Sequence, residues 1–220
     1  MLDKNCPLFN SLSEPELSTL SSVSKVRVLN KNEYLCAQNK CREHFFTIVS
    51  GSATIERIFA NGHRQIVAFL FPGEMAGLYN SESFEYGVKS LAPLTVNQFQ
   101  NDELIELSEK IPRLRENLKD VREKVSNMIF NQLYLLGQKK AHERVCYLLA
   151  QLLERMPDAS PSLLDLPMTR LDIADHLGLT VETVSRSMTK LKQDGLIDIA
   201  GPHSVSINDL KAVQQLGGIE

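Results

Sequence analysis

Between residues 25 and 100 the hydrophobic positions fall in short runs that are rich in Val, Ile, Phe and Thr. The runs are separated by the turn signals Ser50-Gly51, Asn61-Gly62 and Pro72-Gly73. Asn-Gly between two apolar runs is a strong hairpin signal because both residues tolerate a positive φ. Regular short strands with frequent turns indicate a sandwich or a small barrel. The strands that this pattern predicts are 25–29, 45–49, 53–59, 65–71 and 95–99.

After residue 100 the pattern becomes helical. A short helix is expected over 103–109, and Pro112 stands where the next helix can begin at its first position. The first glycine after Pro112 is Gly137, so the sequence predicts one long helix over 112–138.

One set of positions along this helix alternates steps of four and three residues, which is the heptad pattern of a coiled coil. Its members are Leu114, Leu118, Val121, Val125, Met128, Gln132 and Leu135. The alternative is a helix that packs only on its own domain. The helix is long, however, and Ile129, Leu133 and Leu136 add a second apolar edge. We therefore expect two partners, a sister helix and the β-rich domain, and favour a homodimer through this helix.

Residues 139–155 form another predicted helix and 156–167 a loop, after which comes the most informative segment. Thr169 followed by Asp172 resembles a capping box at the start of a short helix over 171–177. Gly178 supplies a tight turn, and Thr180 caps a second helix that runs to about residue 193. Two short helices joined by a glycine turn are typical of a helix-turn-helix. The β-hairpin expected around 201–203 adds a wing.

The exposed face of the second helix offers side chains that can read base edges. Arg186 can donate two hydrogen bonds to guanine, Glu182 can accept from cytosine, and Ser185 can bond to either. The alternative is that Arg186 and Glu182 form an ordinary ion pair four residues apart on a solvated face. Residues expected to contact DNA phosphates are Thr169, Arg170, Thr180, Thr183, Thr189, Lys190 and His203.

Composition and charge change this interpretation little. The chain has 220 residues, 43% of them hydrophobic, which suits one large or two small domains with a proper core. The net charge of −3 is only permissive for nucleic acid, since a groove-reading protein needs positive charge on one face and not in total. The sequence shows neither a secretory signal nor an apolar stretch long enough for a membrane span. We expect a cytoplasmic protein with no membrane partner.

The four cysteines stand at 6, 36, 41 and 146, and in a reducing compartment they are expected to be free thiols. Their spacing gives no metal or iron–sulfur motif, so no cofactor is predicted. The sequence also lacks a Gly-rich phosphate loop and a nucleophile elbow, and an enzyme is not expected.

The segment Gly178–Arg186, with Met168–Arg170 before it, closely resembles the recognition segment of the CRP/FNR regulators. Phe46–Gly51 and Phe69–Gly77 resemble turns of that family's β-roll. Ile111-Pro112 resembles the start of its dimer helix, and Ala141–Arg144 the hinge into its DNA-binding domain. The resemblance covers nearly the whole chain.

The resemblance implies an α+β fold in three parts. These are a cyclic-nucleotide-binding-like β-roll (jelly roll) over 1–110, a dimerisation helix over 111–138 and a winged helix-turn-helix over 139–220. It also implies a homodimer whose partners are double-stranded DNA and RNA polymerase. Val181 before Glu182, in the Glu-x-x-Ser-Arg form, is similar to the FNR/FixK branch, which favours palindromes with TTGAT half-sites.

Departures from the family pattern concern the ligand. Members that bind cyclic AMP hold its phosphate with an Arg-Ser pair and its ribose with a Glu; this chain has Phe84-Glu85 and Leu78 there. A cyclic phosphate facing Glu85 would be repelled, so cyclic AMP binding is not expected. Only Cys6 resembles one of the cluster cysteines of FNR, and His44 or His63 as a haem ligand would be a lone surface histidine. An unidentified ligand, thiol chemistry at Cys36, Cys41 or Cys146, and no ligand at all stay open.

Overall fold

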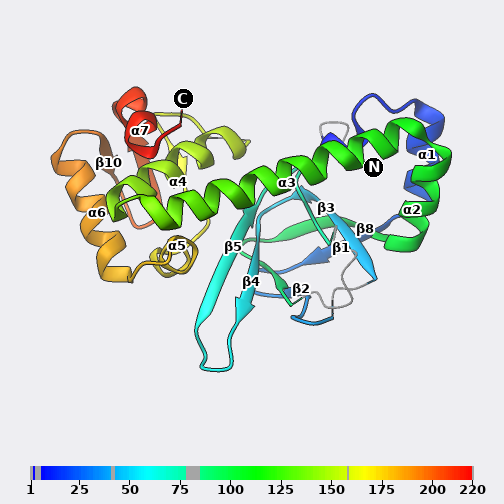
Figure 1. Cartoon of the computed structure of the whole chain (residues 1–220), viewed down its shortest axis with the longest axis horizontal. Helices are drawn as coiled ribbons and strands as arrows, with labels where there is room; N and C mark the ends of the chain where they lie inside the picture. Colours follow the sequence, from blue (N-terminus) through cyan, green and yellow to red (C-terminus); the bar gives the residue numbers. More distant parts are fainter. Residues whose placement is uncertain (1, 3–5, 41–42, 78–84, 158, 220) are drawn as a thin grey trace. The chain divides into compact units, whose positions relative to one another are not determined.

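The computed structural model describes residues 2, 6–40, 43–77, 85–157 and 159–219 (Figure 1). Two four-stranded antiparallel sheets form the β-rich part of the chain, in the strand orders β1-β8-β3-β6 and β2-β7-β4-β5. The first sheet contains β1 (Lys25–Leu29), β8 (Leu94–Gln100), β3 (His44–Ser50) and β6 (Met75–Ala76). The second contains β2 (Tyr34–Cys36), β7 (Gly87–Ser90), β4 (Ala53–Ile58) and β5 (Arg64–Leu70).

The two sheets enclose one apolar core, because alternate residues of each strand point to the same face. Both sheets contribute to it, and its members include Phe46, Ile48, Val96, Ile55, Leu70 and Val88. All five strands predicted from the sequence are confirmed, with ends shifted by one residue at most. The structure adds β2, β6 and β7, which have only two to four residues each and are too short to show a period.

The predicted Asn61-Gly62 hairpin is confirmed between β4 and β5. Gly62 has φ +82°, and the Phe59 N–H donates to the carbonyl of His63 at 2.9 Å. The turn therefore has the left-handed residue that its tight connection requires.

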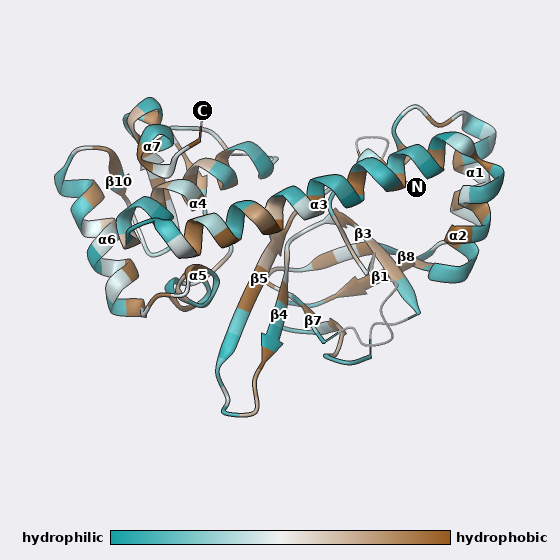
Figure 2. Ribbon diagram, viewed as in Figure 1, coloured by the Kyte–Doolittle hydropathy of each residue, from teal (hydrophilic) through white to brown (hydrophobic). Residues whose placement is uncertain are grey.

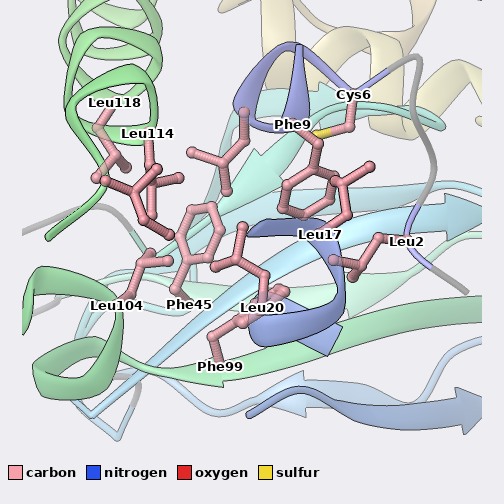
Figure 3. Close-up of a cluster of buried hydrophobic side chains, with 12 residues drawn as sticks. Leu2, Cys6, Phe9, Leu17, Leu20, Phe45, Phe99, Leu104, Leu114 and Leu118 are labelled. Atoms are coloured by element: carbon pink, nitrogen blue, oxygen red, sulfur yellow. The ribbon is translucent and has the colours of Figure 1, made fainter. Parts of the chain in front are cut away.

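A second apolar cluster lies on the other face of the β1-β8-β3-β6 sheet. Phe45 and Phe99 project from that face and meet residues of η1 (Pro7–Phe9), α1 (Glu14–Ser22), α2 (Asn101–Lys110) and the first turns of α3 (Pro112–Gln138) (Figure 3). The amide of Asn117, which is buried, donates to the carbonyls of Leu8 and Asn10, both at 2.9 Å. The start of α3 is thus fixed to the β-rich unit.

Helix α3 has the predicted span, but its heptad positions correct the seam prediction. Leu114, Leu118, Val121 and Leu135 are buried within their own chain, and the side chain of Gln132 donates to a backbone carbonyl of the same chain. The four apolar residues have no free surface for a sister helix in this structure, whereas Gln132 is half-exposed. The heptad pattern failed to separate the two possibilities because a domain core and a coiled coil require the same spacing.

Ile129 and Leu133 of the second apolar edge are exposed, and so is the neighbouring Met128. Val125 is half-buried. Figure 2 shows brown, hydrophobic residues along the C-terminal half of the helix. The large apolar side chains exposed there are Met128, Ile129, Phe130, Leu133 and Tyr134.

The chain forms two compact units, Met1–Ile129 and Phe130–Glu220, and the boundary falls within α3. In the second unit α3 is followed by α4 (Ala141–Arg155), and the chain ends with α7 (Leu210–Gly217), which the sequence analysis did not predict. The two helices pack closely, since a Cβ on Gly217 would lie 2.9 Å from the backbone of Tyr147. No helix in the described ranges is long and apolar enough to cross a membrane.

Gly51 and Gly62 make a matched pair for testing the β-rich unit. Both have left-handed φ, +84° and +82°, but a Cβ on Gly51 would collide with the carbonyl oxygen of Pro93, whereas a Cβ on Gly62 meets nothing within 4 Å. We expect Gly62→Ala to lower the free energy of unfolding by about 1–2 kcal/mol through backbone strain alone. Gly51→Ala should cost at least about 1 kcal/mol more. Urea unfolding followed by circular dichroism measures both, and equal losses would contradict the clash.

Candidate nucleic-acid interface

Two short helices in the second unit form the predicted helix-turn-helix, α5 (Arg170–Leu177) and α6 (Val181–Gln193). The capping box at α5 is confirmed: the Thr169 N–H donates to the Asp172 carboxylate at 2.8 Å and the Asp172 N–H to the Thr169 hydroxyl at 3.2 Å. Gly178 ends α5 in the left-handed conformation, φ +62°. The Thr180 hydroxyl then accepts from the Thr183 N–H at 3.2 Å and caps α6. Contacts between residues close in the sequence therefore fix the start of α5, the turn at Gly178 and the start of α6.

Helix α6 has one buried and one exposed face. The buried side chains are Val184, Ser187, Met188 and Leu191. Glu182, Ser185 and Arg186 are exposed, and they lie three and four residues apart, which places them on one side of the helix. The structure brings the three predicted base-reading residues together on the N-terminal half of an accessible helix.

The charge of Glu182 is maintained by its position in the first turn of α6. The backbone N–H of Glu182 itself and the Thr180 hydroxyl hydrogen-bond the carboxylate and lower its pKa, and the positive charge of Arg186 adds a smaller effect. At neutral pH Glu182 is therefore an ionised acceptor, the form needed to take a hydrogen bond from a base amino group.

The wing is a three-stranded sheet of β9 (Leu164–Asp165), β11 (Ser204–Ile207) and β10 (Ile197–Ile199). The predicted hairpin is confirmed by the β10–β11 pairing, and β9 lies where the sequence analysis expected only loop. At the wing turn, Nδ1 of His203 lies 2.9 Å from the carbonyl oxygen of Leu166. Because a carbonyl only accepts, Nδ1 is the donor in this contact.

The residues predicted to contact phosphates differ in what their side chains already do. The hydroxyls of Thr169 and Thr189 donate to Asp172 at 2.7 Å and to the Ser185 carbonyl at 3.0 Å. The hydroxyls of Thr180 and Thr183 bond to each other at 3.1 Å, and Lys190 pairs with Asp194 at 2.9 Å. Each would have to exchange or share a partner to reach DNA.

Arg170 is half-buried at the start of α5. Its Nη1 has no hydrogen-bond partner among the described residues, and burial lowers the pKa of its guanidinium. A buried donor without a partner costs free energy, and an anion within reach of Nη1 would supply the missing acceptor.

Two residues outside the helix pair also contact it, and the sequence analysis did not assign them there. Gln132 and Arg144 donate to backbone carbonyls at the end of α5. Gln132 stood in the heptad seam, and Arg144 stood only in a segment that resembles a hinge. The sequence signal that could have revealed this contact is that Gln132 is the single polar residue among the apolar heptad positions.

Similarity to known proteins decides the family. Residues 143–216 match the Crp-like helix-turn-helix domain and residues 26–110 the cyclic nucleotide-binding domain. The nitrogen fixation regulation protein FixK of Rhizobium meliloti is 32% identical over 182 residues, 82% of this chain and 81% of FixK. The chain belongs to the CRP/FNR family.

Further relatives place it in the FNR/FixK branch. The transcriptional activator protein FnrL of Cereibacter sphaeroides is 29% identical over 211 residues, 92% of this chain and 84% of FnrL. The solved structure of FixK2 from Bradyrhizobium japonicum has a TM-score of 0.82 and 26% identity, and the match covers 88% of this chain and 97% of that chain. The fold and family predictions are confirmed, and the helix-turn-helix makes this CRP/FNR member a DNA-binding protein.

The ligand side of the CRP/FNR β-roll is described in part. Leu78 and Phe84, which stand at the nucleotide-contact positions, lie outside the described residues. Glu85 pairs with Arg57 at 2.6 Å. A cavity of about 250 Å³ is lined by residues of β2, β4 and β7 and of the segment after β2, among them Tyr34, Glu56 and Gly87. In the described ranges no group of three or more His, Cys, Asp and Glu residues could hold a metal ion.

The thiols of this CRP/FNR chain differ from the expectation at one position. Cys6 and Cys146 lie outside any disulfide, as predicted, and both are buried. Cys36 is disulfide-bonded, which contradicts the prediction of a free thiol, and Cys41 lies outside the described residues. Burial raises the pKa of Cys146 to about 12, and the charge of Glu143 adds to the shift. Because only the thiolate is nucleophilic and the Cys146 side chain is buried, we expect Cys146 not to react in the folded chain.

Labelling with iodoacetamide at pH 8 tests the state of these cysteines. We expect no modification of Cys146 in native protein and full modification in urea. Cys36 should react only after a reductant is added. Peptide mass spectrometry measures both, and rapid native labelling of Cys146 would contradict its burial.

Proposed function

We propose that this CRP/FNR protein is a homodimeric transcription regulator that reads a palindrome with TTGAT-type half-sites. We further propose that it acts without cyclic AMP and without an iron–sulfur cluster. The observation that carries the proposal is the exposed N-terminal half of α6, where Glu182, Ser185 and Arg186 share one face. A recognition helix in the major groove presents that half to the bases.

The palindrome follows from symmetry. A dimer with a two-fold axis carries two copies of α6, and these read two half-sites in opposite directions. The exposed side chains Ile129, Phe130, Leu133 and Tyr134 on α3 support this assembly. Contiguous apolar surface of this kind marks an interaction site in a soluble protein, and a second copy of the same helix presents the matching surface.

Independence from cyclic AMP is supported by the charges at Glu85. Arg57 points to the same side of β4 as the core residue Ile55, by the alternation of the strand. Its guanidinium already forms an ion pair with Glu85, with 2.6 Å between Nη2 of Arg57 and Oε2 of Glu85. A cyclic phosphate would meet a carboxylate and would have to break this ion pair.

The case against an iron–sulfur cluster rests on the cysteines. Such a cluster needs convergent thiolates, whereas Cys6 and Cys146 are buried in different units and Cys36 is disulfide-bonded. The disulfide at Cys36 favours redox gating of the β-rich unit as a second candidate. We also propose RNA polymerase as a partner, because relatives such as FnrL are named transcriptional activators.

Replacing Arg186 by Ala tests base reading. Arg186 is exposed on α6, so the fold should be unaffected, while the loss of a bidentate contact to guanine should cost about 1–3 kcal/mol per half-site. Fluorescence anisotropy with the TTGAT palindrome and a scrambled duplex at two salt concentrations measures the loss. The matched control is Gln193→Ala at the end of the same helix. If Arg186→Ala keeps the wild-type preference for the palindrome, α6 does not read it.

Arg170→Ala should behave differently in the same assay. The loss of a phosphate contact should weaken binding to both duplexes alike and reduce the salt dependence.

Replacing Leu133 by Glu tests the dimer. Leu133 is 63% exposed in the single chain, so the variant should fold. In the dimer two carboxylates would be brought into an apolar contact. We expect a dimer for wild type at micromolar concentration and a monomer for Leu133→Glu in sedimentation velocity. Asn127→Glu, a polar exposed position on the same helix, should stay dimeric. A monomeric wild-type protein would refute the assembly.

A further inference from the structure

The last carbonyl groups of α5 are held by side chains from two other helices. A helix leaves its final carbonyls without partners inside the helix. The Nε2 of Gln132 on α3 donates to the carbonyl of His176 at 3.0 Å. The Nη1 of Arg144 on α4 donates to the carbonyl of Leu177 at 2.9 Å. The end of α5 is therefore bound from two sides.

The same guanidinium also binds the end of α3. Its Nη2 donates to the carbonyl of Leu136 at 2.8 Å and its Nε to the carbonyl of Lys139 at 2.9 Å. The planar fork of an arginine can satisfy several acceptors in one fixed geometry. Its positive charge also lies at the negative ends of two helix dipoles. One side chain thus joins the C-terminal ends of α3 and α5.

Apolar packing closes the same junction. A Cβ on Gly178 would lie 3.5 Å from Cδ2 of Leu136 and 3.8 Å from Nη1 of Arg144. Leu135 and Leu177 are buried beside these contacts. Helix α6 begins at Val181, three residues after Gly178, so the direction of α6 follows from where the end of α5 is fixed.

We infer that Gln132 and Arg144, here called the α3–α5 clamp, are positioning residues that set the angle of the recognition helix α6 relative to α3. The inference rests on the proposed function, in which α3 joins the two copies. If α3 is the dimer helix, a fixed angle between α3 and α6 fixes the distance and the rotation between the two copies of α6. The clamp then determines which spacing of half-sites the dimer accepts.

The clamp is made of side chains of the chain itself. Its four hydrogen bonds are each between 2.8 and 3.0 Å long. The orientation needed for reading DNA is accordingly built by folding of the second unit.

Two variants, Gln132→Leu and Arg144→Lys, open the clamp in different ways. The first removes one donor, and the second keeps the charge but loses the fork that reaches three carbonyls. Gln138→Leu is the matched control, because it removes a glutamine side chain from the exposed last turn of the same helix. Affinities are measured for one half-site, for the palindrome, and for palindromes with one base pair added to or removed from the spacer.

One base pair rotates a half-site by about a tenth of a turn, so wild type and Gln138→Leu should lose about tenfold or more in affinity when the spacer changes. The clamp variants should keep their half-site affinity within about threefold. They should bind the unaltered palindrome about tenfold more weakly and respond less to the spacer. A wild-type spacing profile in both variants overturns the inference. So does an equal loss of affinity on every duplex, which marks a merely structural role.

A measurement without DNA separates this inference from the proposed function. Residual dipolar couplings of backbone amides are compared for Phe130–Gln138 and Val181–Gln193 in wild type and in both variants. In wild type one alignment should fit both segments, and in the variants the couplings of α6 should shrink relative to those of α3. Unchanged relative couplings overturn the clamp even if the DNA proposal holds. Absence of palindrome binding by wild type overturns the DNA proposal, while shrunken α6 couplings would still support the clamp.

Discussion

Buried carbonyl groups at helix ends need donors, and in the second unit this requirement decides how the helices meet. The carbonyls at the ends of α3 and α5 are satisfied by Arg144 and Gln132, and a carbonyl left buried without a donor costs about 1–3 kcal/mol. The turn at Gly178 and the start of α6 at Thr180 depend on that junction. In the function proposed above, the base-reading face of α6 therefore depends on a polar contact that lies outside that face.

The DNA-binding part could be predicted from the sequence because its signals are local. Thr169, Asp172, Gly178 and Thr180 act on backbone groups within a few residues, and a spacing in the sequence records such contacts directly. The strands with five or more residues were equally predictable from their period. The heptad positions of α3 could not be assigned to a partner for the opposite reason. Whether Leu114 or Leu133 meets another chain depends on which residues the rest of the fold covers. The disulfide at Cys36 and the donor role of Gln132 likewise depend on residues distant in the sequence.

A net charge of −3 is compatible with DNA binding here because charge is used locally. The charge of Glu182 is stabilised by its own backbone N–H and the Thr180 hydroxyl at the start of α6, and there it can serve as an acceptor for a base. Lys190 and Lys192 are paired with Asp194 and Asp198 on the exposed surface, and such pairs are weak and easily exchanged. Counting charges along the chain misses this distinction, since it treats a stabilised acceptor and an exchangeable pair alike.

The exposed apolar edge of α3 has a consequence for how DNA occupancy depends on the concentration of the protein. A single chain leaves Ile129, Phe130, Leu133 and Tyr134 exposed. If this edge is the dimer interface proposed above, two chains must meet before a two-fold site can be occupied. Below the dimerisation constant, occupancy of the operator then rises with the square of the chain's concentration. If the chain acts without a small ligand, as proposed above, its synthesis and proteolysis become the input signal. A modest change in either would be converted into a steeper change in transcription.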